Sequence, residues 1–243
     1  MLIAAFSLPS GHSPMKYKLI LPVVAMLLFS GCAFFFDSKA DEKTAQELVN
    51  DGMEAFNRQR YRSAIESFNK LKDWYPFSKY AILAELKIAD SHFYLGEYEA
   101  AVVAYESFEN LHPRNEAIPY VIFQRGMSFI EQMETVDRDQ TSAKKAIETF
   151  NRLKKTYPNS EYTAQADNYI RLSLKNMAGH EFYVGEFYFK SKHYKAAVVR
   201  FRTVVSSYPD VGLTEKALAY IARCEVELSN EAPPEKKPWW SLW

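Results

Sequence analysis

The sequence has little glycine and cysteine and no net charge. Its 243 residues include eight Gly and two Cys, and 30 basic residues balance 30 acidic ones. A chain without a net positive charge lacks the general field that attracts nucleic acid, so nucleic acid is excluded as an expected partner. Because 48% of the residues are hydrophobic, the chain is long and apolar enough to form a sizeable core.

Motifs for catalysis and metal binding are also missing. The chain contains no G-x-S-x-G, no G-x-x-x-x-G-K-[ST] and no G-x-G-x-x-G, and its five His show no H-E-x-x-H or paired-Cys spacing. Asp137 and Asp139 flank Arg138, but an acidic pair of this kind in a loop is more typical of a solvated or partner-facing turn. We therefore predict no catalytic residue, no metal site, no cofactor and no enzymatic activity.

Residues 1–31 have the pattern of a targeting signal. Two lysines precede an apolar run, Leu19–Phe29, which is too short to cross a membrane comfortably, and small residues precede Cys32. This pattern resembles the lipobox of bacterial lipoproteins, with Phe29 where leucine is usual. The resemblance implies cleavage before Cys32, an N-acyl group such as palmitate and an S-diacylglycerol on Cys32, and a lipidated linker over 32–44. The alternative is an ordinary secretory signal with an incidental cysteine.

The translation start and the destination of the chain are predicted from neighbouring residues. Met15 begins the lysine-containing segment, whereas 1–14 contain no Lys or Arg, so we expect translation to start at Met15. Ala33 follows the lipobox cysteine, and by resemblance to bacterial lipoproteins this implies the outer membrane, on its periplasmic face, with three acyl chains as the anchor. Cys224 is then the one remaining thiol and is expected to be a small buried hydrophobe.

A repeated spacing predicts the fold. Four segments read A-x3-[F/Y]-x7-P, and they are Ala64, Phe68 and Pro76; Ala101, Tyr105 and Pro113; Ala146, Phe150 and Pro158; and Ala197, Phe201 and Pro209. This is the second-helix half of the tetratricopeptide (TPR) repeat. Its small Ala allows close helix packing, its aromatic residue lies on the same face, and its Pro ends the helix. We predict an all-α, right-handed superhelical solenoid of about five TPR-like repeats.

The spacings between the prolines set the domain boundaries. Successive intervals of 37, 45 and 51 residues exceed the period of about 34. We assign 45–114 to repeats 1–2, 115–159 to repeat 3, 160–230 to repeats 4–5 and 231–243 to a tail. Repeat 3 contains an inserted polar loop around 131–140. Repeat 4 begins with a helix of roughly 25 to 30 residues, and Thr214–Leu228 forms a fifth first helix.

The tail combines proline with tryptophan. Trp239, Trp240 and Trp243 lie in the last five residues, after Pro233, Pro234 and Pro238. Tryptophan buries a large area at low entropic cost, so the tail is a candidate docking peptide. The alternative is that it folds back to cap the last helix, as terminal repeats require.

The first helices of the repeats predict a peptide-binding groove, since they line the concave face of such solenoids. The inward positions are Gln46, Val49, Met53, Phe56 and Asn57 in repeat 1; Leu83, Leu86, Asp90, Phe93 and Tyr94 in repeat 2; and Tyr120, Phe123, Met127 and Ile130 in repeat 3. This aromatic, methionine-containing stripe suits an extended or helical peptide with bulky side chains. The alternative is that much of the stripe is packed between adjacent first helices.

Several segments together resemble one family. They are Tyr75-Pro76-Phe77-Ser78-Lys79-Tyr80, Pro119-Tyr120-Val121 followed by Arg125-Gly126, Val136-Asp137-Arg138-Asp139, and Tyr157-Pro158-Asn159-Ser160-Glu161-Tyr162. In their order, and with the lipobox, they resemble BamD, the family of outer-membrane lipoproteins of the β-barrel assembly machinery. The resemblance covers about 45–227.

This resemblance implies a non-enzymatic scaffold in the assembly of outer-membrane proteins. It implies that Tyr75, Pro76, Phe77, Tyr80 and the groove bind unfolded outer-membrane protein segments. The C-terminal repeats, with Asp137, Arg138, Asp139, Arg200 and the tail tryptophans Trp239, Trp240 and Trp243, would dock a BamA-like barrel subunit, and other assembly lipoproteins are possible partners. The family commonly has a second helix in repeat 5, where this chain has the tryptophan-containing tail, so we expect its docking surface to differ. The alternative function is that of a pilotin-type TPR lipoprotein for secretin or type IV pilus assembly.

Overall fold

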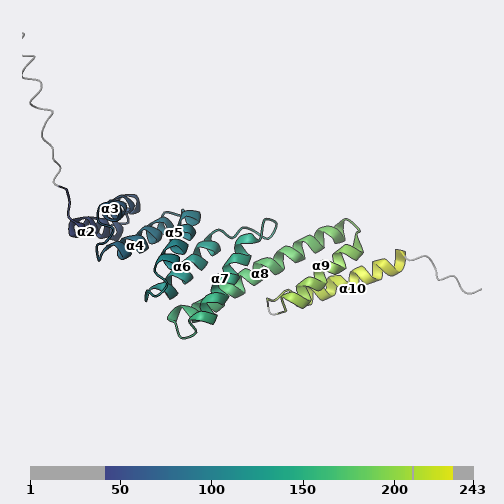
Figure 1. The fold of residues 1–243 in the computed structure, drawn as a ribbon. Helices are drawn as coiled ribbons and strands as arrows, with labels where there is room; N and C mark the ends of the chain where they lie inside the picture. Colours follow the sequence, from purple (N-terminus) through teal and green to yellow (C-terminus); the bar gives the residue numbers. More distant parts are fainter. Residues whose placement is uncertain (1–41, 210, 232–243) are drawn as a thin grey trace, which may run out of the picture. The chain divides into compact units, whose positions relative to one another are not determined.

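The structure, a computed structural model, describes residues 42–209 and 211–231. This part of the chain contains nine α-helices and no β-strand (Figure 1). The helices are α2 (Ala45–Asn57), α3 (Tyr61–Trp74), α4 (Ala81–Tyr94), α5 (Tyr98–Leu111), α6 (Ile118–Glu131), α7 (Thr141–Thr156), α8 (Glu161–Lys190), α9 (Tyr194–Ser207) and α10 (Thr214–Glu231). Each packs mainly against the next helix in the chain, which confirms the prediction of an all-α helical-repeat fold. The targeting signal, Cys32 and the tail with Trp239, Trp240 and Trp243 lie outside the described residues.

The helix pairs are held together by an aromatic side chain that sits on a small residue. Three such pairs are Gly52 with Phe68, Gly126 with Phe150 and Gly185 with Phe201, and all three Phe are fully buried. A Cβ atom added to Gly52 would lie 2.5 Å from the Phe68 ring, so no larger residue fits without movement. In the second repeat Ala89 and Tyr105 take these two positions and are also fully buried. We call this arrangement the aromatic socket of the repeat.

The repeat prolines end the second helices as predicted. Those helices stop at Trp74, Leu111, Thr156 and Ser207, two residues before the respective proline. The intervening residue leaves helical geometry, as Tyr75 does with φ −133° and ψ 56°. A following proline disfavours the helical region for its predecessor, so the chain turns at this point.

The long helix predicted in repeat 4 is α8, which runs for 30 residues without interruption. Its first half, including Tyr162 and Tyr169, packs in one hydrophobic cluster with α6 and α7. Its second half, including Phe182 and Phe189, packs in a second cluster with α9 and α10. A single helix therefore contributes to two cores. None of the helices in 42–209 and 211–231 combines the length and hydropathy that a membrane crossing requires.

Candidate protein-binding surfaces

Five aromatic side chains gather where the first two repeats meet. Tyr61 and Tyr94 stack with ring centroids 5.2 Å apart, and Phe56 meets Tyr94 edge-on at 5.8 Å. Phe93 contacts both Tyr94 and Tyr98 in the same edge-on manner, at 5.7 and 5.6 Å. We call these residues the aromatic cluster. Tyr94 is 51% exposed, so the cluster presents part of its area to solvent.

The turns of the repeats bring these rings together. Phe56, Phe93 and Tyr94 lie in the last turns of α2 and α4, while Tyr61 and Tyr98 are the first residues of α3 and α5. Phe56 and Phe93 therefore lie beside the tyrosine that opens the next helix. Tyr61 and Tyr98 were not among the predicted groove residues. A signal was present, since each precedes the repeat alanine by three residues, as Tyr194 does in repeat 4.

A buried carboxylate links the cluster to the third repeat. The Lys87 ammonium lies 4.6 Å from the centroid of the Phe56 ring and 2.8 Å from Asp90 Oδ2. The hydroxyl groups of Tyr105 and Tyr120 donate to Asp90 Oδ1 at 2.8 and 2.9 Å. Burial, and after it the negative charge of Asp90, raises the pKa of both tyrosines far above the ordinary value. Both phenols therefore stay protonated and act as donors that join α4, α5 and α6.

Three of the predicted groove positions are corrected by their burial. Val49 is 4%, Asp90 1% and Phe123 7% exposed, so none of them offers a surface to a peptide. Phe123 packs against Phe150, Tyr162 and Tyr169, with centroids 5.2 to 5.9 Å apart. The first half of α8 covers this side of α6, because the long helix adds a layer that the repeat pattern alone does not include.

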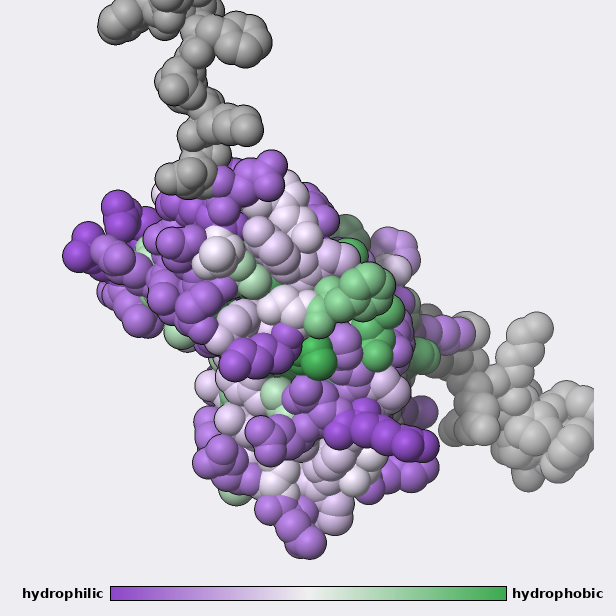
Figure 2. All heavy atoms as spheres, turned by 60° about the vertical axis from the view of Figure 1, so that its left-hand side comes forward, coloured by the Kyte–Doolittle hydropathy of each residue, from purple (hydrophilic) through white to green (hydrophobic). Residues whose placement is uncertain are grey.

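The other predicted groove residues differ in exposure. Met53, Leu86, Tyr120, Met127 and Ile130 are half-buried and pack against the cores, whereas Gln46, Asn57 and Leu83 are exposed. The accessible part of the predicted groove therefore centres on the first two repeats. Figure 2 shows one side of the molecule, on which hydrophilic residues dominate and only a small group of hydrophobic residues reaches the surface. On that side an apolar contact area is limited in extent.

The segment Tyr75–Tyr80 between α3 and α4 contains residues that pack against the core and residues that are exposed to solvent. Tyr75 and Tyr80 pack against the first hydrophobic cluster, and the Tyr80 hydroxyl donates to the side-chain oxygen of Gln46. Pro76 is exposed, and Phe77 is exposed over its whole area. Phe77 is therefore the one residue of this segment that presents a complete aromatic ring to solvent.

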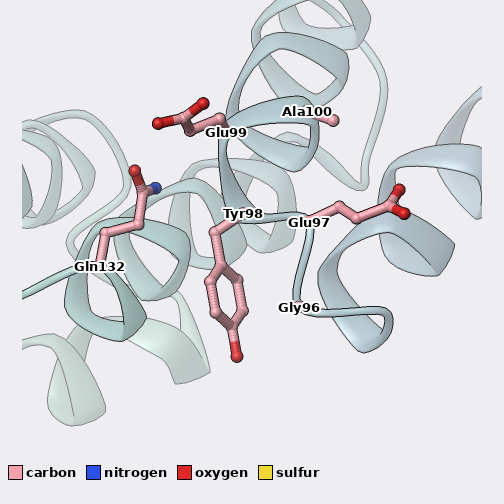
Figure 3. Close-up of a pocket in the computed structure, with 6 residues that line it drawn as sticks. All are labelled: Gly96, Glu97, Tyr98, Glu99, Ala100 and Gln132. Carbon is pink, nitrogen blue, oxygen red and sulfur yellow. The ribbon is translucent and has the colours of Figure 1, made fainter.

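A cavity of about 480 Å³ lies beside the aromatic cluster, at the start of α5 (Figure 3). Gly96, Glu97, Tyr98, Glu99, Ala100 and Gln132 line it. In Figure 3, Gln132 reaches it from the end of α6, and the carboxylates of Glu97 and Glu99 point in different directions. Tyr98 belongs both to this cavity and to the aromatic cluster, so the two form adjoining surfaces. The sequence did not predict this cavity, since its lining comes from two turns in different repeats.

The inserted loop of repeat 3 is fixed on α8. The Asn176 amide donates to the carbonyl oxygen of Glu134 at 2.7 Å, and His180 Nδ1 lies 2.7 Å from the carbonyl oxygen of Val136. Val136 itself rests on Gly179, where an added Cβ would come within 2.7 Å of Val136 Cγ1. Gly179 thus provides space for the loop without interrupting the helix.

The structure brings together predicted docking residues that lie about 60 positions apart. A polar pocket of about 260 Å³ is lined by Arg138, Asp139, Gln140, Lys144, Met177, His180, Glu181 and Tyr208, and we call it the loop pocket. Arg200 binds Glu181 with a 3.0 Å contact, which places its guanidinium beside this pocket. Asp137 does not line it and instead accepts a hydrogen bond from the Thr135 hydroxyl.

Hydrogen bonds, burial and nearby charges set the protonation of two side chains in the loop pocket. The side chain and backbone N–H of Thr141 lower the pKa of Asp139, with smaller contributions from Lys144 and His180. Burial, followed by the charge of Glu181, raises the pKa of Tyr208. Asp139 is therefore a carboxylate and Tyr208 a neutral phenol at physiological pH, so the pocket offers both acceptors and donors.

Two further observations bear on chemistry. Within residues 42–209 and 211–231, no group of His, Cys, Asp or Glu side chains is arranged to hold a metal ion. Cys224 is fully buried in the cluster of α9 and α10, and burial raises the pKa of its thiol. This confirms that Cys224 is a packing residue.

Comparisons with known proteins give a consistent match. A family model named YfiO, described as outer membrane lipoprotein, matches residues 41–238. The outer membrane protein assembly factor BamD of Rickettsia prowazekii is 31% identical over 76% of this chain and 74% of its own length. The BamD of Neisseria gonorrhoeae is 25% identical over 93% and 99%, and that of Vibrio cholerae 26% over 84% and 88%. Among solved structures, the TPR2AB domain of yeast Sti1 gives a TM-score of 0.44 at 16% identity, over 76% of this chain and 71% of that one.

Proposed function

Because the chain belongs to the YfiO family of outer membrane lipoproteins, whose relatives carry the name BamD, we propose that it promotes the assembly of outer-membrane proteins as a scaffold of the β-barrel assembly machinery. The observation that carries this function is the family match over 41–238, which includes all the helices described above. In this function the chain binds other proteins and transforms none of them. A pilotin-type role in secretin assembly has no comparable support.

The aromatic cluster is the proposed binding surface for unfolded outer-membrane protein segments. Its five rings and the adjoining cavity beside Tyr98 combine apolar faces with hydroxyl groups. The fully exposed ring of Phe77, before the other end of α4, is a separate proposed contact for the same segments. Aromatic side chains of this kind bind bulky residues of a peptide with little loss of side-chain entropy. The Lys87 ammonium and its carboxylate partner hold Phe56 in place, so the surface is preorganised.

The loop pocket is the proposed docking surface for a BamA-like barrel subunit. It contains Arg138, Asp139 and the Arg200–Glu181 pair, and therefore offers paired charges of both signs to a polar partner surface. Charges at such an interface contribute mainly to specificity and association rate. Other assembly lipoproteins would occupy further surfaces of the scaffold.

The proposed attachment to the membrane uses lipid on Cys32. This residue lies outside the described part of the chain, and its role rests on the lipobox pattern and on the family. Two acyl chains already give stable anchoring, and a bacterial lipoprotein carries three. The chain would then face the periplasm from the inner leaflet of the outer membrane.

Co-purification tests the proposed complex. The tagged chain is extracted from outer membranes with detergent, and the proteins that remain bound are identified by mass spectrometry. We expect a large β-barrel subunit, and we expect Arg138→Ala combined with Arg200→Ala to reduce its recovery. A secretin ring in place of the barrel subunit would contradict the proposal.

Substitutions in the aromatic cluster test the proposed substrate surface. We expect Phe56→Glu and Phe93→Glu to weaken the binding of aromatic-ended outer-membrane protein peptides, measured by calorimetry. Val103→Glu is the matched control, because Val103 is 66% exposed on α5 and lies outside the cluster. Equal affinities for all three variants and the parent chain would refute the assignment of this surface.

A further inference from the structure

The outer face of α10 carries an apolar stripe. Leu218, Ala222 and Val226 follow one another at intervals of four residues, which places them on one side of the helix. Leu218 is 50% and Val226 58% exposed, and Ala222 is exposed as well. The other side of α10, with Ala217 and Cys224, is fully buried against the rest of repeat 4. In the described residues no further helix covers the stripe.

The stripe occupies the register of an aromatic socket. Ala222 follows Pro209 by 13 residues, just as Ala89 follows Pro76 and Gly126 follows Pro113. Ala89 and Gly126 are buried, and at Gly126 the ring of Phe150 lies 2.6 Å from the position of an added Cβ. Ala222 is the corresponding small residue of α10, and it is open to solvent. Within residues 42–209 and 211–231, α10 therefore provides the first-helix half of a socket, and no ring fills it.

The sequence supplies rings one and two positions beyond the matching distance. The aromatic residue follows the small residue by 16 positions in the pairs Gly52 and Phe68, Ala89 and Tyr105, and Gly185 and Phe201, and by 24 in the pair Gly126 and Phe150, whose repeat contains the inserted loop. The same count from Ala222 reaches Pro238, directly before Trp239 and Trp240. The family match ends at residue 238, so it includes neither tryptophan.

We propose that Trp239 and Trp240 pack on the stripe of Leu218, Ala222 and Val226 and fill the socket of α10 within the same chain. The eight residues from Glu231 to Trp239 can span up to about 26 Å when extended. The return distance along the helix, from Glu231 to Ala222, is about 14 Å, so the segment is long enough. Its short tether gives the rings a high effective concentration at the stripe, which favours this occupant over a second copy or another protein.

Quenching of tryptophan fluorescence by acrylamide tests this inference in the purified full chain. Trp74, which is 51% exposed, is first replaced by phenylalanine, so that only the three tail tryptophans report. We expect blue-shifted emission and weak quenching in this parent. Ala222→Glu should move both values towards those of a synthetic peptide of residues 232–243. Ala164→Glu, at an exposed alanine of α8, is the matched control and should resemble the parent.

Several outcomes would overturn the inference. Strong quenching in the parent would mean that the rings are not packed at all. Weak quenching that persists in both Ala222→Glu and Leu218→Glu would mean that they pack elsewhere. Protection that disappears on dilution would assign the stripe to a second copy of the chain. Far-UV circular dichroism of each variant confirms that α10 is intact, since glutamate is a good helix former.

Discussion

Replacing Tyr105 with phenylalanine distinguishes an expectation based on the repeat pattern from one based on the hydrogen bonds of the structure. Phe68, Phe150 and Phe201 hold the same position in the other repeats, so Tyr105→Phe moves repeat 2 towards the common pattern. Substitutions towards a consensus are usually neutral or stabilising. The structure predicts the opposite result, because Tyr105 donates a 2.8 Å hydrogen bond to the Asp90 carboxylate, which is only 1% exposed.

The expected magnitude follows from the charge and the burial of Asp90. A hydrogen bond to a charged group contributes about 1.5–3 kcal/mol, and a buried carboxylate that loses a donor cannot replace it with water. Asp90 keeps Tyr120 and Lys87, so the loss stays within this range. For a chain of this size, we expect a decrease in Tm of about 3–12 °C.

Urea denaturation with hydrogen exchange measures the effect. The free energy of unfolding should decrease at constant m-value, with the loss concentrated in α4, α5 and α6. In an Asp90→Asn background the same substitution should cost less, because the charged acceptor is gone. Phe150→Tyr is the mirror control, since Met127 stands where repeat 2 has Asp90, and it should destabilise the chain. A Tyr105→Phe chain as stable as its parent would refute the reasoning.

Two other contacts give testable effects. Burial alone would raise the pKa of Glu109, but the hydrogen bond from Arg152 and the charges of Arg152 and Arg125 lower it below its ordinary value. A carboxyl group whose pKa is lower in the folded state stabilises the fold fully at pH values above its unfolded pKa of about 4.3, and this contribution is lost as the pH falls through the folded-state pKa. The free energy of unfolding in urea should therefore depend less steeply on pH in Glu109→Gln than in the parent chain. The same pH dependence of the free energy of unfolding in the variant and the parent would contradict this. Gly179→Ala should loosen the inserted loop despite a gain in helix propensity of about 1 kcal/mol, because its Cβ meets Val136. Limited proteolysis of the loop should detect this, and Val136→Ala in the same chain should restore protection.

The sequence predicted the features that depend on neighbouring residues. The prolines end their helices through the residue before them, and the small residue and the aromatic residue of each repeat meet because they lie in consecutive helices. The length of α8 followed from a long stretch without proline. Each of these predictions uses contacts within one repeat.

Contacts between distant residues were beyond such reasoning. Phe123 and Tyr94 both fit the inward pattern of a first helix, yet Tyr162 and Tyr169 cover only Phe123. The pattern placed Asp90 on the inward face but could not identify Tyr120, 30 residues later, as its partner. Which positions of a repeated pattern stay open thus depends on where the irregular elements of the chain pack.

The continuity of α8 has a mechanical consequence. Its two halves belong to different cores, and no loop between them can absorb a change in angle. Inserting one residue near Gly179 would turn everything after it by about 100° and advance it by 1.5 Å. The number of residues in this helix therefore sets the rotation of the repeats that follow it relative to the repeats that precede it.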